Sequence, residues 1–165
     1  MSQATIAPKI GQNTVSFMLL SGHIIPAVGL GTWKSGSQAS ISVYTAIVQV
    51  GHAFQQAMHV GCERSELFVT SKLWCSDLSP ERVRPALNKT LQELQLDHLD
   101  LYCWIHWPFR LKEGASRPPK AGEVLDFDME GVWREMEKLV KEGLVRNIGV
   151  CNFAINELSK TAEFV

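Results

Sequence analysis

The sequence predicts an α/β protein built on parallel strands, and two observations carry this prediction. Short apolar runs rich in strand-forming residues alternate with amphipathic helical patterns, and the links between them are short. Strand and helix alternating in this way give parallel strands joined by right-handed crossovers. Four runs suit the wall of a barrel: 26–33, 67–73, 100–107 and 145–153.

Two architectures fit this alternation, an open doubly wound sheet and part of a (β/α)8 barrel. No G-x-G-x-x-G or P-loop motif follows any of the predicted strands, which argues against an open sheet that binds nucleotides. A complete barrel needs about 250 residues, whereas this chain has 165. The chain can therefore supply only part of a barrel.

The first elements are a hairpin and a helix. Residues 15–33 are predicted to form two strands joined by a turn at Ser21 and Gly22. Residues 39–59 have helical spacing of their apolar side chains. Gly51 interrupts this pattern, so either two short helices or one weakened long helix is expected.

The later helices have clear start and stop signals. Ser79 and Pro80 predict a helix over 79–96, as its N-cap and first helical residue. The helix over 128–143 is expected to end on Gly143 as a C-cap. Between them, residues 108–127 are rich in Pro, Gly and Lys and are predicted to be irregular.

Composition excludes several classes of function. A net charge of −1 with 45% hydrophobic residues gives no basic surface for nucleic acid or membranes. No membrane span or signal peptide is recognisable, so the cytoplasm is the expected location. The four cysteines are widely spaced, which favours free thiols. No metal is expected, because the spacing of His52, His59 and Cys62 matches no known zinc ligand set.

His106 stands between two tryptophans in "LYCWIHWPFR", at the end of an apolar run and just before Pro108. A histidine at the end of a buried strand points towards the place where ligands bind in α/β folds. Taken alone, it is better read as a core histidine with its hydrogen bonds satisfied. The other strand ends have to decide between these readings.

Taken together, the strand ends resemble the aldo-keto reductase superfamily, in particular its plant aldose-reductase-like branch. The resemblance covers nearly the whole chain after residue 15, but only about the first half of a family member. It implies a partial TIM barrel, with an N-terminal hairpin and about four barrel strands, in which the second strand and the C-terminal half are missing. Residues 1–165 would then be one incomplete domain. The matching stretches are "PAVGLGTWKSG", "LFVTSKLWC", "SPERVRPALNKTLQELQLDHLDLY", "IHWPFRLK" and "IGVCNF".

The resemblance implies a function, the NADPH-dependent reduction of aldehydes and ketones. In that family a tyrosine donates a proton to the carbonyl oxygen, a lysine lowers the pKa of this tyrosine, an aspartate holds the lysine, and a histidine orients the substrate. By motif, Lys72 corresponds to the lysine and His106 to the histidine. Cofactor contacts fall on Thr32, Trp33, Lys34 and Asn152, and the walls of the substrate pocket on Trp33 and Trp107.

The family's aspartate and tyrosine have no counterpart in this chain. Both belong to a segment between two helices, and here "YTAIVQ" (44–49) runs straight into "VGHAFQQAMHVG" (50–61). The second barrel strand and both residues are therefore expected to be missing as one block. The residues themselves support this, because no Asp or Glu occurs before Glu63.

No other tyrosine is expected to act as the proton donor. Tyr44 lies in a helix, and Tyr102 lies four residues before His106, about 13 Å away along the strand. Family members usually have three steps between this tyrosine and the histidine. One extra residue in a strand reverses the direction of the side chains beyond it unless a bulge absorbs it. Either Tyr102 or His106 is then expected to face the wrong side.

Cofactor binding and partners are the remaining expectations. The family's residues for the NADP 2′-phosphate lie beyond the matched region, so binding of NADP(H) is expected to be weakened. Unpaired strand edges are expected to promote self-association. Three alternatives follow: a weak or inactive carbonyl reductase, a non-catalytic interaction or decoy protein that pairs through its strand edges, and a truncated product without function.

Overall fold

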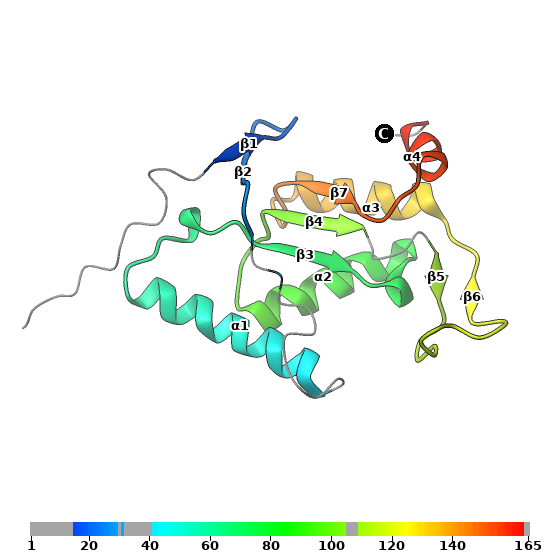
Figure 1. Cartoon of the computed structure of the whole chain (residues 1–165), viewed down its shortest axis with the longest axis horizontal. Coiled ribbons are helices and arrows are strands. Elements are labelled where there is room, and N and C mark those ends of the chain that lie inside the picture. Colours follow the sequence, from blue (N-terminus) through cyan, green and yellow to red (C-terminus); the bar gives the residue numbers. More distant parts are fainter. Residues whose placement is uncertain (1–14, 30, 32–40, 105–108, 164–165) are drawn as a thin grey trace, which may run out of the picture. The chain divides into compact units, whose positions relative to one another are not determined.

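A computed structural model describes residues 15–29, 31, 41–104 and 109–163, without the side chains of 41–49 and of Trp104. The chain divides into two compact units. One comprises Met1–Phe68 with Gln92–Leu96, and the other comprises Val69–Leu91 with Asp97–Val165. Figure 1 labels the elements of both units.

The first unit begins with the predicted hairpin. Strand β1 (Ser16–Met18) pairs antiparallel with β2 (Ile24–Pro26). Gly22 has a φ of 83°, a conformation that glycine adopts without strain, and its N–H donates to the carbonyl of Leu19 at 2.9 Å. The prediction of a turn at this position is therefore confirmed.

The barrel strand predicted over 26–33 does not form within the described residues. Only Pro26 lies in a strand, and the Ala27 N–H still donates to the carbonyl of Val15 at 2.8 Å. Residues 28, 29 and 31 belong to no strand, and residues 30, 32 and 33 lie outside the described part. A strand exists only where another strand pairs with it, and glycines such as Gly29 and Gly31 weaken an unpaired segment further.

Helix α1 (Ile41–His59) continues through Gly51, which decides between the two alternatives in favour of one long helix. Gly51 is buried, and a Cβ atom at this position would lie 2.5 Å from the carbonyl oxygen of Glu93. Next to it, the Gln55 amide donates to the carbonyl of Gln95 at 2.8 Å. The glycine thus allows α1 to approach the 92–96 segment closely. A short 3-10 turn, η1 (Arg64–Glu66), follows the helix.

The second unit is built on a parallel sheet in the order β3-β4-β7. Its strands are β3 (Thr70–Leu73), β4 (Leu101–Trp104) and β7 (Ile148–Val150). They confirm three of the four predicted strands, in shorter form. The register pairs Lys72 with Cys103, and Cys103 with Gly149.

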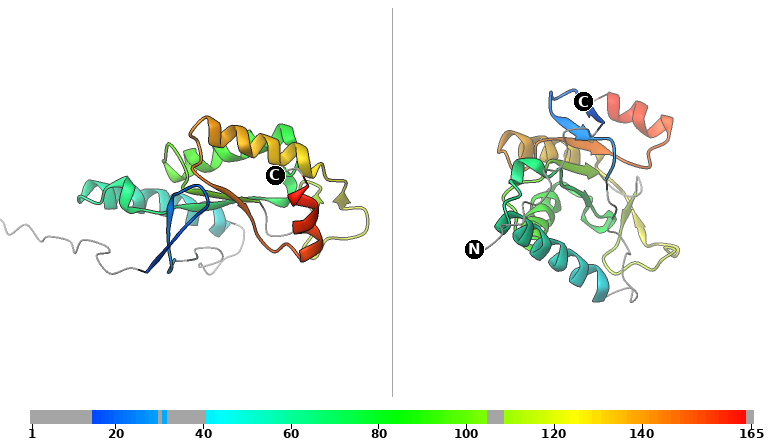
Figure 2. Two further views of the ribbon diagram at one scale, coloured as in Figure 1. Left: turned by 90° about the horizontal axis from the view of Figure 1, so that it is seen from above. Right: turned by 60° about the vertical axis from the view of Figure 1, so that its left-hand side comes forward.

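Two helices cover one face of this sheet (Figure 2). Helix α2 (Pro80–Leu94) begins at the predicted proline. Helix α3 (Met129–Lys141) begins after Asp128, whose carboxylate accepts the N–H of Gly131, and ends before Gly143 at a φ of 77°. A bidentate ion pair between Arg84 and Glu142 joins the two helices. The core contains fully buried side chains from both layers: Leu73, Val83, Leu87, Tyr102, Val132, Met136 and Leu139.

The segment between β4 and α3 contains more regular structure than predicted. Strands β5 (Arg110–Leu111) and β6 (Val124–Leu125) form a short antiparallel ladder inside the region 108–127, which was expected to be irregular. Two residues on each side are enough for such a ladder when the intervening loop is fixed by its own hydrogen bonds. A 3-10 turn, η2 (Cys75–Asp77), follows β3, and helix α4 (Ile155–Ala162) follows β7.

Candidate functional site

Lys72 lies in β3 with its side chain exposed. Neighbouring residues in register on parallel strands share a face, so Lys72 lies on the same face as Cys103 and Gly149. This face is opposite to the one that α2 and α3 cover, because alternate residues of a strand point to opposite sides. Lys72 forms no ion pair with any carboxylate of the described residues.

The neighbours of Lys72 are two thiols. The pKa of Cys103 is raised to about 11, mainly by burial and to a smaller extent by the nearby Cys151 thiol, while Lys72 opposes both effects. Burial also raises the pKa of Cys151, again against the effect of Lys72. At neutral pH both groups are therefore neutral thiols, and neither offers Lys72 the negative charge that an aspartate would.

Tyr102 lies on the face opposite to Lys72. Its partner in the register is Ser71, one residue before Lys72. The side chain is 0% exposed, and burial raises its pKa above the usual value, with the charge of Asp77 as a smaller cause. A phenol in this position cannot reach a carbonyl bound beside Lys72. The side chain of Tyr44 lies outside the described residues.

Asn152 follows β7 and has an exposed side chain. Its backbone is left-handed, with a φ of 58°, which asparagine tolerates better than most residues. Asn152 and Lys72 thus lie at the carboxyl edge of one sheet, on strands separated by β4. Two strand spacings correspond to about 10 Å.

Five of the predicted site residues lie outside the described part of the chain. They are Thr32, Trp33, Lys34, His106 and Trp107.

The opposite edge of the sheet is structural. Asp100 is 2% exposed, and its carboxylate accepts the N–H of Val69 at 2.8 Å and a guanidinium N–H of Arg146 at 3.0 Å. The Asn147 amide donates to the carbonyl of Asp100 at 2.7 Å. These bonds hold the amino-terminal ends of the three strands together, where residues of a barrel serve stability rather than catalysis.

A contact at the carboxyl end of β3 was missed by sequence reasoning. Trp74 follows the strand directly, and the guanidinium carbon of Arg117 lies 4.4 Å from its ring centroid. Arg117 lies between β5 and β6, in a segment whose composition predicts no defined position. The position of Trp74, two residues after Lys72, could have indicated a site residue from the sequence. No sequence pattern indicated Arg117.

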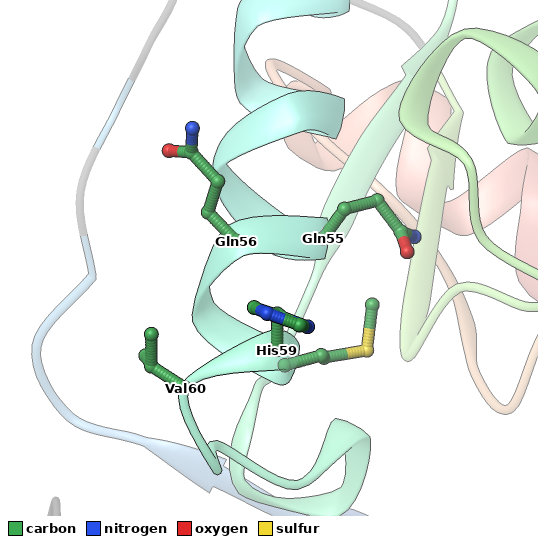
Figure 3. Close-up of a pocket in the computed structure, with 5 residues that line it drawn as sticks. Gln55, Gln56, His59 and Val60 are labelled. Carbon is green, nitrogen blue, oxygen red and sulfur yellow. The ribbon is translucent and has the colours of Figure 1, made fainter.

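An open hollow in the first unit lies at the carboxyl end of α1 (Figure 3). It is lined by Gln55, Gln56, Met58, His59 and Val60. The amide of Gln55 is already bonded to the carbonyl of Gln95, and the lining contains one imidazole and no carboxylate. In the described part of the chain, no group of three or more His, Cys, Asp or Glu side chains gathers as metal ligands would.

The described residues thus form a parallel sheet covered by helices, with a lysine and an asparagine at its carboxyl edge. The aldo/keto reductase family model matches residues 42–164. The chain belongs to the aldo/keto reductase family. The prediction of this family from the strand-end motifs is therefore confirmed.

Relatives from plants and animals support this assignment. The chain is 38% identical to "Aldo-keto reductase family 4 member C11" of Arabidopsis thaliana, over 89% of this chain and 52% of the relative. It is 42% identical to "Deoxymugineic acid synthase 1" of Oryza sativa, over 87% of this chain and 52% of the relative. The chain thus spans about half the length of the curated relatives it matches.

Solved structures show the same fold. An aldose reductase of Schistosoma japonicum superimposes with a TM-score of 0.79 at 33% identity, covering 92% of this chain and 57% of the other. An aldo-keto reductase of Bombyx mori in complex with NADP gives 0.78 at 31% identity, covering 92% and 55%. The expected partial barrel is confirmed: the described residues form a parallel sheet with helices, and they close no barrel.

Two further observations concern the chain itself. The match to the Arabidopsis relative runs over 170 residues, although it includes only 89% of a chain of 165. The relative therefore has residues inside the matched region that lack a counterpart here. Among the described helices, none combines the length and the apolar character needed to cross a membrane.

Proposed function

We propose that this chain is one incomplete aldo/keto reductase domain that keeps part of a nicotinamide half-site and reduces carbonyl compounds weakly or not at all. One observation carries the proposal: Tyr102 is fully buried on the face of the sheet opposite to Lys72. A proton donor must come within hydrogen-bond reach of the carbonyl oxygen. The Arabidopsis relative has residues inside the matched region that lack a counterpart here, which supports an internal gap. We place this gap between residues 49 and 50, where the motifs of the family segment break off.

Some residues of the chain fit part of the cofactor. NADPH supplies a hydride in this chemistry, and the exposed Asn152 would bind the carboxamide of its nicotinamide. Thr32, Trp33 and Lys34 would contribute further contacts, and His106, Trp33 and Trp107 would surround a small carbonyl substrate. The family resemblance assigns no residue among 1–165 to the 2′-phosphate. We expect these 165 residues by themselves to bind NADPH weakly.

The test combines an NADPH titration, followed by tryptophan fluorescence, with an assay of carbonyl-dependent NADPH oxidation. We expect saturable quenching and an oxidation rate at least about 10²-fold below that of a full-length relative, since a proton-transfer group contributes about 10²–10⁴-fold. Asn152→Ala should weaken the quenching. Asn156→Ala, an exposed asparagine in α4, is the matched control.

The variant Tyr102→Phe tests whether Tyr102, buried on the face opposite to Lys72, takes part in the reaction. The residual oxidation rate should be unchanged in this variant, because the hydroxyl group faces the helices. A rate close to that of a full-length relative, or its loss in Tyr102→Phe, would show that the proposal is wrong.

The edges of the sheet favour a second candidate, a non-catalytic protein that pairs with another chain. Strands β3 and β7 are the outer strands of the sheet in the described part of the second unit, and each has one edge without a strand partner there. Such edges offer N–H and C=O groups to a further strand. A chain that binds no NADPH but associates with a full-length relative would favour this candidate over the first.

A further inference from the structure

We propose that Arg117, stacked on Trp74 at the carboxyl end of β3, is an anion-binding residue that holds the carboxylate of a carbonyl substrate. The inference rests on the proposed function, because it gives the substrate class of the site marked by Lys72. It adds a residue that the family resemblance did not supply. All of the residues involved lie in the second unit.

Trp74 lies close to Lys72 along the chain, and Arg117 is stacked on Trp74. Trp74 follows Lys72 by two residues, which is about 7 Å along a strand. The guanidinium carbon of Arg117 lies 4.4 Å from the centroid of the indole ring. Stacking uses the flat face of the guanidinium group and leaves its N–H edge for hydrogen bonds. That edge matches the two oxygens of a carboxylate.

The loop that carries Arg117 is held in one shape by its own hydrogen bonds. One carboxylate oxygen of Glu123 accepts the Ser116 hydroxyl at 2.6 Å, the Ser116 N–H at 3.2 Å and the Lys120 N–H at 2.6 Å. These bonds lower the pKa of Glu123, with the Ser116 hydroxyl as the largest cause. The Lys112 N–H also donates to the carbonyl of Glu123 at 2.9 Å. A cation held in this way is positioned before a ligand arrives.

The charges of the loop are not balanced within it. The Glu113 carboxylate pairs with Arg82 at 3.0 Å, and Glu123 is bonded across the loop. In the described residues, the cations Lys112, Arg117 and Lys120 form no ion pair. The segment from 112 to 123 therefore presents positive charge, while its own carboxylates are occupied. This arrangement favours an anionic ligand.

The test compares two five-carbon ketones on the full 165-residue chain. 4-Oxopentanoate carries a carboxylate and pentan-2-one does not. Binding is measured by calorimetry and by tryptophan fluorescence. We expect 4-oxopentanoate to bind about tenfold more tightly, the effect of a hydrogen-bonded charged pair at an exposed site. Arg117→Gln should remove this preference, and Arg117→Lys should keep only part of it, because an ammonium group lacks the planar fork.

Lys120→Gln is the matched control. It removes one charge from the same loop, and the structural role of Lys120 belongs to its backbone N–H. The preference should persist in this variant. Equal affinity for the two ketones, the same preference in Arg117→Gln, or an equal loss in Lys120→Gln would overturn the proposal, and the stacked pair would then be a surface contact without a ligand.

Inorganic phosphate distinguishes a substrate carboxylate from a cofactor phosphate. Phosphate that competes with NADPH at Arg117, and not with 4-oxopentanoate, assigns the residue to the cofactor and overturns the proposal. The NADPH titration reports on the proposed function separately. If the chain binds no NADPH but still prefers 4-oxopentanoate through Arg117, only the proposed nicotinamide half-site is refuted. If the chain binds NADPH but shows no preference that depends on Arg117, only the proposed anion site is refuted.

Discussion

The pKa of the Cys103 thiol, on the same face of the sheet as Lys72, differs strongly between the folded and the unfolded chain. Burial raises its pKa from 9.0 to about 11. The unfolded chain therefore loses this proton first as the pH rises, and the folded state loses its advantage between about pH 9 and pH 11. Tyr102, whose pKa is also raised by burial, acts in the same direction above about pH 10.

We expect the free energy of unfolding to fall by about 1–2 kcal/mol between pH 8 and pH 10.5 because of Cys103. Urea unfolding at the two pH values measures this change. In Cys103→Ala the fall should be smaller by that amount, whatever the variant costs at pH 8. An identical pH dependence in both proteins would contradict the burial of the thiol.

At the scale of residues, sequence motifs predicted which residues lie at strand ends, but they did not predict side-chain directions that depend on strand register. Lys72 and Asn152 were found because each follows a recognisable strand. The side on which Tyr102 faces remained open, since the extra residue in "YCWIH" leaves the direction of the strand undetermined. Pairing of Ser71 with Tyr102 resolves it. Arg117 depends on a loop shape set by Glu123, seven residues from Ser116, which no local pattern reveals.

At the scale of elements, α1 depends on a glycine that helix propensity disfavours. Alanine is favoured over glycine inside a helix by about 1 kcal/mol. At position 51, however, a Cβ atom would lie 2.5 Å from the backbone oxygen of Glu93. Backbone cannot move aside as a flexible side chain can, so the contact with the 92–96 segment would have to open.

Gly51→Ala should therefore lower the thermal midpoint, although propensity alone predicts a rise. Gln56→Ala is the control, because Gln56 is exposed on the same helix and propensity decides there. Circular dichroism during heating measures both variants. A higher midpoint for Gly51→Ala would mean that α1 does not pack closely on that segment.

Strands and helices were predicted correctly where local sequence signals decide them, and incorrectly where pairing with a distant segment decides them. The parallel strands follow from buried runs, and the start of α2 follows from a proline at the first helical position. The Ser79 hydroxyl, predicted to cap this helix, makes no hydrogen bond with the helix backbone. The run at 26–33 has similar composition, but in the described part only Pro26 pairs with another strand. Conversely, the β5–β6 ladder arises in a Pro- and Gly-rich segment because its loop is closed by side-chain hydrogen bonds.

At the scale of the whole molecule, the outer edges of β3 and β7 and the apolar hairpin are candidate sites of association. Several large apolar side chains of the hairpin region are more than 60% exposed: Val15, Phe17, Met18, Leu20, Ile24 and Val28. Exposed apolar surface and open strand edges both promote contact between copies.

We expect sedimentation velocity to show mass that rises with protein concentration. If strand edges carry the contact, Phe17→Lys should leave the association unchanged, since it alters only the hairpin. Dissociation of this variant would assign the contact to the hairpin instead. A single monomeric species at all concentrations would contradict both forms of the prediction.

Helix α1 runs without a break across residues 49 and 50, where the proposed gap lies. The segments on both sides of this position are helical, so joining them gives one longer helix without an irregularity in the backbone. The effect of the proposed gap would then fall on the site, where Lys72 would lack the aspartate that the family resemblance implies.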